Sequence, residues 1–305
     1  MKYLKIVLII CLYVIPLQFL ACQAKHKPAT KPKSDLELAH LKGKVKSIRS
    51  STLSVFENAP SHFEGSFYDI AGNKLQDYDS MVNMVVSKML YKHDANGNRI
   101  EDDSYTDGRF QGKVIREYDA EGNMIKQTYY DSTGKNQGKW SFAHDDSGNI
   151  VEENSYSPDG TVLVKWYHHY DEHNHLKKDE GYKGDSLFHT TEYKMDAKGN
   201  MLEENHFNGK GKLFTRFTYS YDSAGNKLED RDYSGMDTVD KQSTYKYDSH
   251  GNEISWVLDY YRPRTLHVEY ITRYEYDSLG NWIKEIYEEN GNSSSKVERR
   301  IEYYK

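Results

Sequence analysis

Aromatic and polar residues alternate over short stretches along most of the chain, and each stretch ends in a turn signal. Tyr245 and Tyr247, for example, flank Lys246. Because successive side chains of a β-strand point to opposite faces, this alternation predicts strands with one aromatic and one polar face. Leu36 to Leu41 could form a single helical turn. No other stretch beyond the N-terminal leader indicates a helix.

The turn signal itself is a repeat of the form aromatic-Asp-x-x-Gly-Asn. Its aspartates are 25 or 26 residues apart, except for a last step of 29 from Asp248 to Asp277. A degenerate copy at Asp171 has no glycine, and Asn174 is expected to replace it. The aspartates and glycines of the other copies are Asp69 and Gly72, Asp94 and Gly97, Asp119 and Gly122, Asp145 and Gly148, Asp196 and Gly199, Asp222 and Gly225, Asp248 and Gly251, and Asp277 and Gly280.

The residues of this repeat explain how it bends the chain. Aspartate first and glycine fourth fits a type I turn closed by a left-handed residue in a G1 bulge. The aspartate accepts hydrogen bonds from nearby backbone N–H groups, and glycine tolerates positive φ. Calcium is an alternative at Asp94-x-Asn96-x-Asn98, but most copies lack the third oxygen ligand and an EF-hand would need a distant glutamate.

A second turn lies about halfway through each unit, so the chain reverses about every 13 residues. Residues 41–305 are therefore predicted to be all-β: a repetitive antiparallel hairpin meander of about 20 strands, in a long twisted or spiralling sheet. Arg299 to Lys305 is expected to be the last strand, and Leu41 to Ser54 an irregular first hairpin.

The Tyr-Asp-x-x-Gly-Asn units resemble the YD repeats of the RHS family of bacterial surface and toxin-delivery proteins. The likeness covers nearly all of the chain after residue 60. It implies a spiralling β-sheet, which closes into a shell around a toxin domain in the large members, and some members are described as carbohydrate-binding. This chain is far shorter, so an open curved sheet is expected. The half-units are more weakly similar to MORN-type hairpin repeats.

The N-terminus has the pattern of a secretory signal. Lys2 and Lys5 precede an apolar run of about 15 residues, shorter than the ~20 that a membrane-spanning helix needs. Phe19-Leu20-Ala21-Cys22 then resembles the lipobox of bacterial lipoproteins, which implies that Cys22 is lipidated. The predicted divisions are a signal peptide at 1–22, a flexible tether at 23–40 and the repeat domain at 41–305. The alternative is ordinary secretion with cleavage nearby, for example after Ala24.

Composition narrows the classes of partner and compartment. The chain has two cysteines, Cys11 and Cys22, so the processed chain would have no internal disulfide. Forty-seven acidic residues against 41 basic ones, without a basic stripe, argue against nucleic acid as a partner. Only 37% of the residues are hydrophobic, yet 27 are tyrosines, which suit half-buried sheet surface.

Three sets of residues are candidates for a site. A cluster of histidines could bind zinc, but a drifted repeat with solvent-facing imidazoles explains it as well; its members are His168, His173 and His175. Paired carboxylates at Glu152-Glu153, Glu203-Glu204 and Glu288-Glu289 read as solvated strand residues rather than as catalytic pairs. Aromatic side chains that could stack on a ligand, or simply pack within the sheet, are Trp140, Trp166, Tyr219, Tyr221, Tyr245 and Tyr247.

The predicted function is that of a non-enzymatic, lipid-anchored repeat protein of the cell envelope, with the outer membrane as the expected location. It would act as a binding or interaction scaffold for a protein or glycan ligand. No catalytic residue, cofactor or nucleic-acid partner is predicted, and the lipid anchor is the predicted contact with the membrane. The alternative is a carbohydrate-active enzyme or an accessory protein of an RHS-type toxin system.

Overall fold

The computed structural model describes residues 33–54, 62–81, 86–234 and 237–305. The expected signal peptide, Cys22 and residues 23–32 of the expected tether lie outside the described residues. Within the described ranges, no helix has both the length and the apolar character needed to cross a membrane.

The described chain is almost entirely β-structure, as predicted. One short helix, α1 (Asp35–Leu38), precedes the sheet. The strands are β1 (Val45–Ser54), β2 (His62–Tyr68), β3 (Lys74–Met81), β4 (Val86–His93), β5 (Arg99–Thr106), β6 (Arg109–Tyr118), β7 (Met124–Asp131), β8 (Asn136–His144), β9 (Ile150–Tyr156), β10 (Val162–Tyr170), β11 (Leu176–Lys183), β12 (Ser186–Met195), β13 (Met201–Asn208), β14 (Leu213–Tyr221), β15 (Lys227–Ser234), β16 (Thr238–Tyr247), β17 (Glu253–Tyr260), β18 (Leu266–Tyr276), β19 (Trp282–Glu289) and β20 (Asn292–Tyr303).

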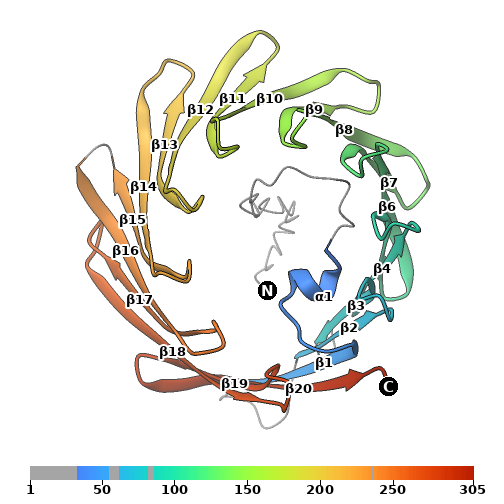
Figure 1. The fold of residues 1–305 in the computed structure, drawn as a ribbon, viewed down its shortest axis with the longest axis vertical. Coiled ribbons are helices and arrows are strands. Elements are labelled where there is room, and N and C mark those ends of the chain that lie inside the picture. Colours follow the sequence, from blue (N-terminus) through green and yellow to red (C-terminus); the bar gives the residue numbers. More distant parts are fainter. Residues whose placement is uncertain (1–32, 55–61, 82–85, 235–236) are drawn as a thin grey trace, which may run out of the picture.

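All 20 strands belong to one antiparallel sheet, and each pairs with its neighbours in sequence. The sheet is closed, because β20 also pairs with β1 from Val45–Tyr303 to Ser54–Ser295. Figure 1 shows the resulting ring. The expectation of an open sheet is therefore wrong, as is that of a first hairpin within 41–54, where β1 is a single strand. Register shifts recur beside the turns, and such bulges bend and twist a sheet toward closure.

The predicted turn chemistry is confirmed. At the first turn, Gly72 N–H donates to the Asp69 carbonyl at 3.1 Å and Asp69 N–H donates to the Asn73 carbonyl at 2.9 Å. The same two bonds recur at every copy. Gly72 has φ +90°, and Asn174 takes the left-handed position in the degenerate copy with φ 61°. We call these nine turns, from the aspartate to the residue four later, the Asp–Asn turns.

Helix α1 lies inside the ring and identifies the inner face of the sheet (Figure 1). Leu36 of α1 packs with Ile48 and Tyr68, so these side chains point inward. Cross-strand partners share a face, and the register carries the inner face around the ring and back to Ile48. The inner partners run Ile48–Ser66–Asp77–Met89, Tyr91–Asp102–Val114–Tyr129, Gln127–Trp140–Ser155, Glu153–Trp166, His168–Asp179–Thr191–His206, Tyr193–Glu204–Phe217, Tyr219–Asp230–Ser243, Tyr245–Trp256–Tyr270, Tyr274–Glu285–Val297 and Ile301–Ile48.

The two faces differ in chemistry. The aromatic face predicted from the alternation is the inner one. The outer face carries cross-strand ion pairs, such as Arg216 with Glu203 at 3.2 Å and Lys126 with Glu117 at 2.8 Å. The apolar core is small and lies where the ring closes, with Leu36 of α1 over Val45, Ile48, Tyr68 and Ile301.

Candidate functional site on the inner face

A carboxylate recurs at one position of the inner face, four residues after the last residue of each Asp–Asn turn. Seven of the nine copies have it, and Gln127 and Trp256 replace it in the others. Several of these side chains are buried: Asp102 and Asp179 are each 4% exposed and Glu153 is 9% exposed. The seven carboxylates are Asp77, Asp102, Glu153, Asp179, Glu204, Asp230 and Glu285.

Most of these carboxylates accept a hydrogen bond from a donor on the following strand. The distances are 2.9 Å for Tyr91 to Asp77, 2.7 Å for Arg116 to Asp102, 2.7 Å for Tyr193 to Asp179, 3.1 Å for Tyr219 to Glu204 and 2.6 Å for Tyr245 to Asp230. Where Gln127 replaces the carboxylate, the donor position holds Phe142. The inner wall is therefore a row of donor–carboxylate couples.

Burial and the neighbouring carboxylate set the protonation of these couples. Burial, and then the negative charge of Glu204, raise the pKa of Tyr219 above its ordinary value, so its hydroxyl stays a donor. Burial alone would raise the pKa of Asp102, but hydrogen bonds from Arg116 and Arg99 hold it below its usual range. At neutral pH the Tyr219 hydroxyl is thus a fixed donor and the Asp102 carboxylate a fixed charge in the wall.

Tyrosines at the ends of several strands link neighbouring units of the repeat. Tyr118, Tyr170 and Tyr247 reach back to the residue that follows the previous Asp–Asn turn and donate to its carbonyl oxygen, at 2.8, 3.0 and 2.9 Å. Tyr276 and Tyr303 instead donate to the turn aspartates Asp248 and Asp277. These hydroxyls therefore form hydrogen bonds within the wall.

The proposed stacking residues lie on the inner face, but most of them already contact other groups of the wall. Tyr219, Tyr245 and Tyr247 donate to wall groups as described above. Trp166 packs edge-on against Phe188, with ring centroids 5.6 Å apart. Trp140 is half-buried on β8, opposite Gln127, and Tyr221 is half-buried at the end of β14. Stacking on a ligand stays a prediction for these residues, and Trp140 is the best placed because no aromatic ring covers it within the described residues.

The densest titratable group of the inner face lies on β9 to β13. His168, 8% exposed, faces Asp179 across the β10–β11 pair, with 2.6 Å between Nδ1 and Oδ1. Its Nε2 lies 3.7 Å from Glu153 and has no hydrogen-bond partner among the described residues. Burial raises the pKa of Glu153. Burial alone would lower the pKa of His168, but Asp179 and Glu153 raise it.

This group extends through Thr191 to two further histidines, His189 and His206. Thr191 Oγ1 lies 3.0 Å from His189 Nε2 and 3.3 Å from His206 Nδ1, and His206 Nε2 lies 2.8 Å from Glu204. The Glu153–His168 pair brings two titratable groups close together, and only 8% of His168 and 9% of Glu153 is exposed.

The three histidines that were candidate zinc ligands do not come together. His168 faces Asp179, whereas His173 and His175 lie in the degenerate turn with their rings stacked, 6.0 Å between centroids. Among the described residues, the set with ligand atoms close enough for one metal ion is His62, Glu64 and Asp79, on β2 and β3. Its position was not anticipated, because the three residues are brought together only by the β2–β3 register.

The paired carboxylates divide between the two faces, as alternation requires. Glu203 faces outward to Arg216, and Glu204 faces inward to Tyr219. The interpretation as solvated strand residues is therefore wrong for Glu153, which is buried. The signal that identifies the inner carboxylates is their fixed distance from the turn asparagine.

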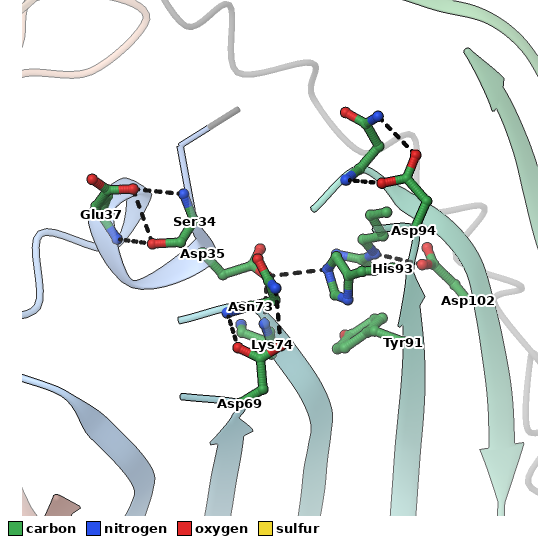
Figure 2. A network of polar contacts seen from close by, with 12 residues as sticks. Ser34, Asp35, Glu37, Asp69, Asn73, Lys74, Tyr91, His93, Asp94 and Asp102 are labelled. Atoms are coloured by element: carbon green, nitrogen blue, oxygen red, sulfur yellow. Dashed lines mark hydrogen bonds and ion pairs between the residues drawn. The ribbon is translucent and has the colours of Figure 1, made fainter. Parts of the chain in front are cut away.

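At the rim, α1 is fixed to the first Asp–Asn turn (Figure 2). Ser34 and Glu37 form a capping box. Leu36 N–H donates to the Gly72 carbonyl at 3.1 Å, and the Asp35 carboxylate accepts from Lys74 N–H at 2.5 Å and lies 3.5 Å from His93 Nε2. The last part of the range expected to be a tether is thus folded against the sheet.

No protein-family model matches the chain, and no curated protein matches it. Among solved structures, a porin-like protein from Bacteroides uniformis has a TM-score of 0.38 at 12% identity, covering 86% of this chain and 98% of that one. TcdB2-TccC3 without its hypervariable C-terminal region has a TM-score of 0.40 at 15% identity, covering 83% of this chain and 16% of that one. The Photorhabdus luminescens Tc holotoxin pore has a TM-score of 0.39 at 15% identity, covering 83% of this chain and 15% of that one.

The chain thus spans about a sixth of the length of the Tc toxin chains that it resembles. At these TM-scores and identities the likenesses say nothing of function. The resemblance to YD repeats stays a prediction from the repeat residues.

Proposed function

We propose that this protein is an exported, lipid-anchored binding module of the cell envelope, without enzymatic activity, that takes a protein or glycan ligand at the inner face of its closed sheet. The observation that carries the proposal is the β1–β20 pairing, which joins the two ends of the sheet. A closed sheet with an aromatic and carboxylate-lined interior suits enclosure of a ligand, whereas an open sheet would offer a flat surface.

The charged side chains of the outer face support the proposal that the repeat domain lies beside the membrane rather than within it. Lys126 and Glu117 pair there at 2.8 Å, and Arg216 and Glu203 at 3.2 Å. Charged side chains are costly on a lipid-facing sheet surface. The proposed anchor is the lipid on Cys22, and radioactive palmitate labelling that is lost in Cys22→Ala is the expected result.

A matched pair of variants separates the two faces. Trp140 is a half-buried aromatic residue of the inner face, and Tyr233 is its counterpart on the outer face, opposite Arg216. The protein is screened on a glycan array and against envelope protein fractions, and each hit is measured by calorimetry and assayed for turnover.

We expect Trp140→Ala to weaken binding at least tenfold and Tyr233→Ala to leave it unchanged, with both variants folded by circular dichroism. Binding that depends on Tyr233 alone would place the ligand outside the ring. Turnover of a bound glycan would contradict a non-enzymatic role and favour the carbohydrate-active alternative.

A further inference from the structure

One cross-strand pair of the inner face departs from the rest of the repeat. Glu64 on β2 is directly opposite Asp79 on β3, two residues from the inner carboxylate Asp77. All nine hairpins that contain an Asp–Asn turn lie within the described residues. In none of the other eight does this pair consist of two acids, and in the third it is Val114 with Tyr129. The hairpin therefore forms without the two carboxylates.

These two carboxylates have no basic partner of fixed charge. Like charges directly opposite each other on adjacent strands destabilise a sheet. Among the described residues, neither Glu64 nor Asp79 forms an ion pair with a lysine or arginine, and the titratable group that contacts both is His62. Arg299 of β20 also lies on the inner face, but its guanidinium is over the Trp282 ring, 3.1 Å from the centroid. The pair therefore lacks a counter-charge.

His62 brings an imidazole to both carboxylates. Its Nε2 lies 2.8 Å from Asp79 Oδ1 and 3.7 Å from Glu64 Oε1. A tetrahedral zinc ion with bonds of about 2.1 Å holds its ligand atoms about 3.4 Å apart, which lies between these two distances. The three ligand atoms all lie within 4.8 Å of one another. The three residues are thus placed as three ligands of one ion, with a fourth position open.

The site is accessible, and a cavity adjoins it. The side chains of Glu64 and Asp79 are 54% and 58% exposed, and that of His62 is 24% exposed. Both carboxylates line a cavity of about 320 Å³, together with Ser66 and Asp77. An ion can therefore enter from solvent, and its fourth position is open to water or to an oxygen atom of a ligand in the cavity.

We propose that His62, Glu64 and Asp79 bind a divalent transition-metal ion, and that zinc is the ion that best suits one imidazole and two carboxylates. The ion supplies the counter-charge that the opposed carboxylates lack. The imidazole favours it over calcium, which takes oxygen ligands. The proposal does not rest on the ligand proposed for the inner face, so either can fail without the other.

The test is isothermal titration calorimetry of the full-length protein with zinc chloride. The protein is made without a histidine tag, kept in detergent and freed of metal with a chelator. We expect one site per chain that equimolar calcium does not displace, and a higher melting temperature when zinc is present. Binding should weaken at acid pH, because ligation needs a neutral imidazole and ionised carboxylates.

Amide variants locate the ion. His62→Gln, Glu64→Gln and Asp79→Asn are each expected to weaken zinc binding at least tenfold. The matched control is His267→Gln, because His267 Nδ1 lies 2.7 Å from Asp259 Oδ1. This contact resembles that of His62 with Asp79, but among the described residues it has no second carboxylate close enough to share an ion. The control should leave zinc binding unchanged.

Glu64→Gln also separates ligation from folding. It removes one of two opposed like charges, so the metal-free variant should melt at the wild-type temperature or above it, while the rise caused by zinc is lost. No saturable zinc binding, displacement of zinc by equimolar calcium, wild-type affinity in Glu64→Gln and Asp79→Asn, or an equal loss in His267→Gln would overturn the proposal.

Discussion

His168 donates from Nδ1 to Asp179 across the β10–β11 pair at 2.6 Å, and both side chains are more than nine-tenths buried. Removing one partner of such a pair leaves the other buried without its counter-charge, which costs about 3–5 kcal/mol. We therefore expect Asp179→Asn to lower the free energy of unfolding by about this amount. Urea denaturation at neutral pH measures it, and a loss below about 1 kcal/mol would contradict the role given to the pair.

The same cluster gives a pH dependence with a definite sign. The pKa values of His168 and Glu153 are both raised in the folded protein, so folding favours their protonated forms. Their stabilising contribution is present below the unfolded pKa values, about 6.5 and 4.5, and is lost as pH rises through the raised values. His168→Gln should flatten the fall in melting temperature between pH 6 and pH 8. An unchanged slope in the variant would show that the cluster does not cause it.

The Asp–Asn turns give the opposite pH dependence of stability. Burial alone would raise the pKa of Asp94 and Asp119, but hydrogen bonds from Asn98 and Asn123 hold both below the usual range. Their contribution is present above about pH 3.8 and is lost as pH falls through the lowered values. Replacing both aspartates by asparagine should lower the urea midpoint at pH 7 and make its decline toward pH 2.5 shallower. A parallel decline in variant and wild type would refute this.

Comparing alanine substitutions at Gly72 and Gly108 distinguishes the loss of the contact with α1 from the cost of backbone strain. Both have positive φ, +90° and +73°. A Cβ on Gly72 would lie 2.8 Å from Ser34 Oγ, whereas a Cβ on Gly108 meets nothing within 4 Å. Gly72→Ala should therefore lose more stability than Gly108→Ala and release residues 34–41. Hydrogen exchange of the Leu36 amide measures that release, and equal protection in both variants would count against the docking role of Gly72.

Ring closure can be tested by a disulfide between the first and last strands. Ser51 and Glu298 are directly opposite on β1 and β20. Ser51→Cys combined with Glu298→Cys should form a disulfide in the folded protein, because opposed residues of antiparallel strands have suitable Cβ separations. Mass spectrometry of the digested protein detects it. Ser51→Cys with Arg300→Cys, two residues out of register, is the control, and equal oxidation of both pairs would contradict the register.

The local part of the fold could be predicted from the sequence because its causes are local. Asp69 and Gly72 set a turn by their own hydrogen bonding and φ, and Asn174 could be identified as the left-handed residue of the copy without glycine. The alternation of Tyr245 and Tyr247 identified one aromatic face. Each of these features depends on residues within one hairpin.

Closure and the inner-face site depend on many hairpins at once. No single residue marks the β1–β20 contact, because closure results from the twist and bulges accumulated over 20 strands. The pairing of Tyr219 with Glu204 joins residues on adjacent strands, and its repeat signal is the constant distance between each carboxylate and the turn before it. The recurrence of carboxylate pairs at repeat positions is typical of solvated strand residues, and it does not show which member of a pair, such as Glu153, is buried in the inner wall.

Since β1 hydrogen-bonds to β20, the growing chain carries two unsatisfied sheet edges until Asn292–Tyr303 has been synthesised. Exposed edges pair readily with other chains. Strand β20 therefore protects the protein against association during biosynthesis, and a chain released before β20 has been made would be prone to aggregate.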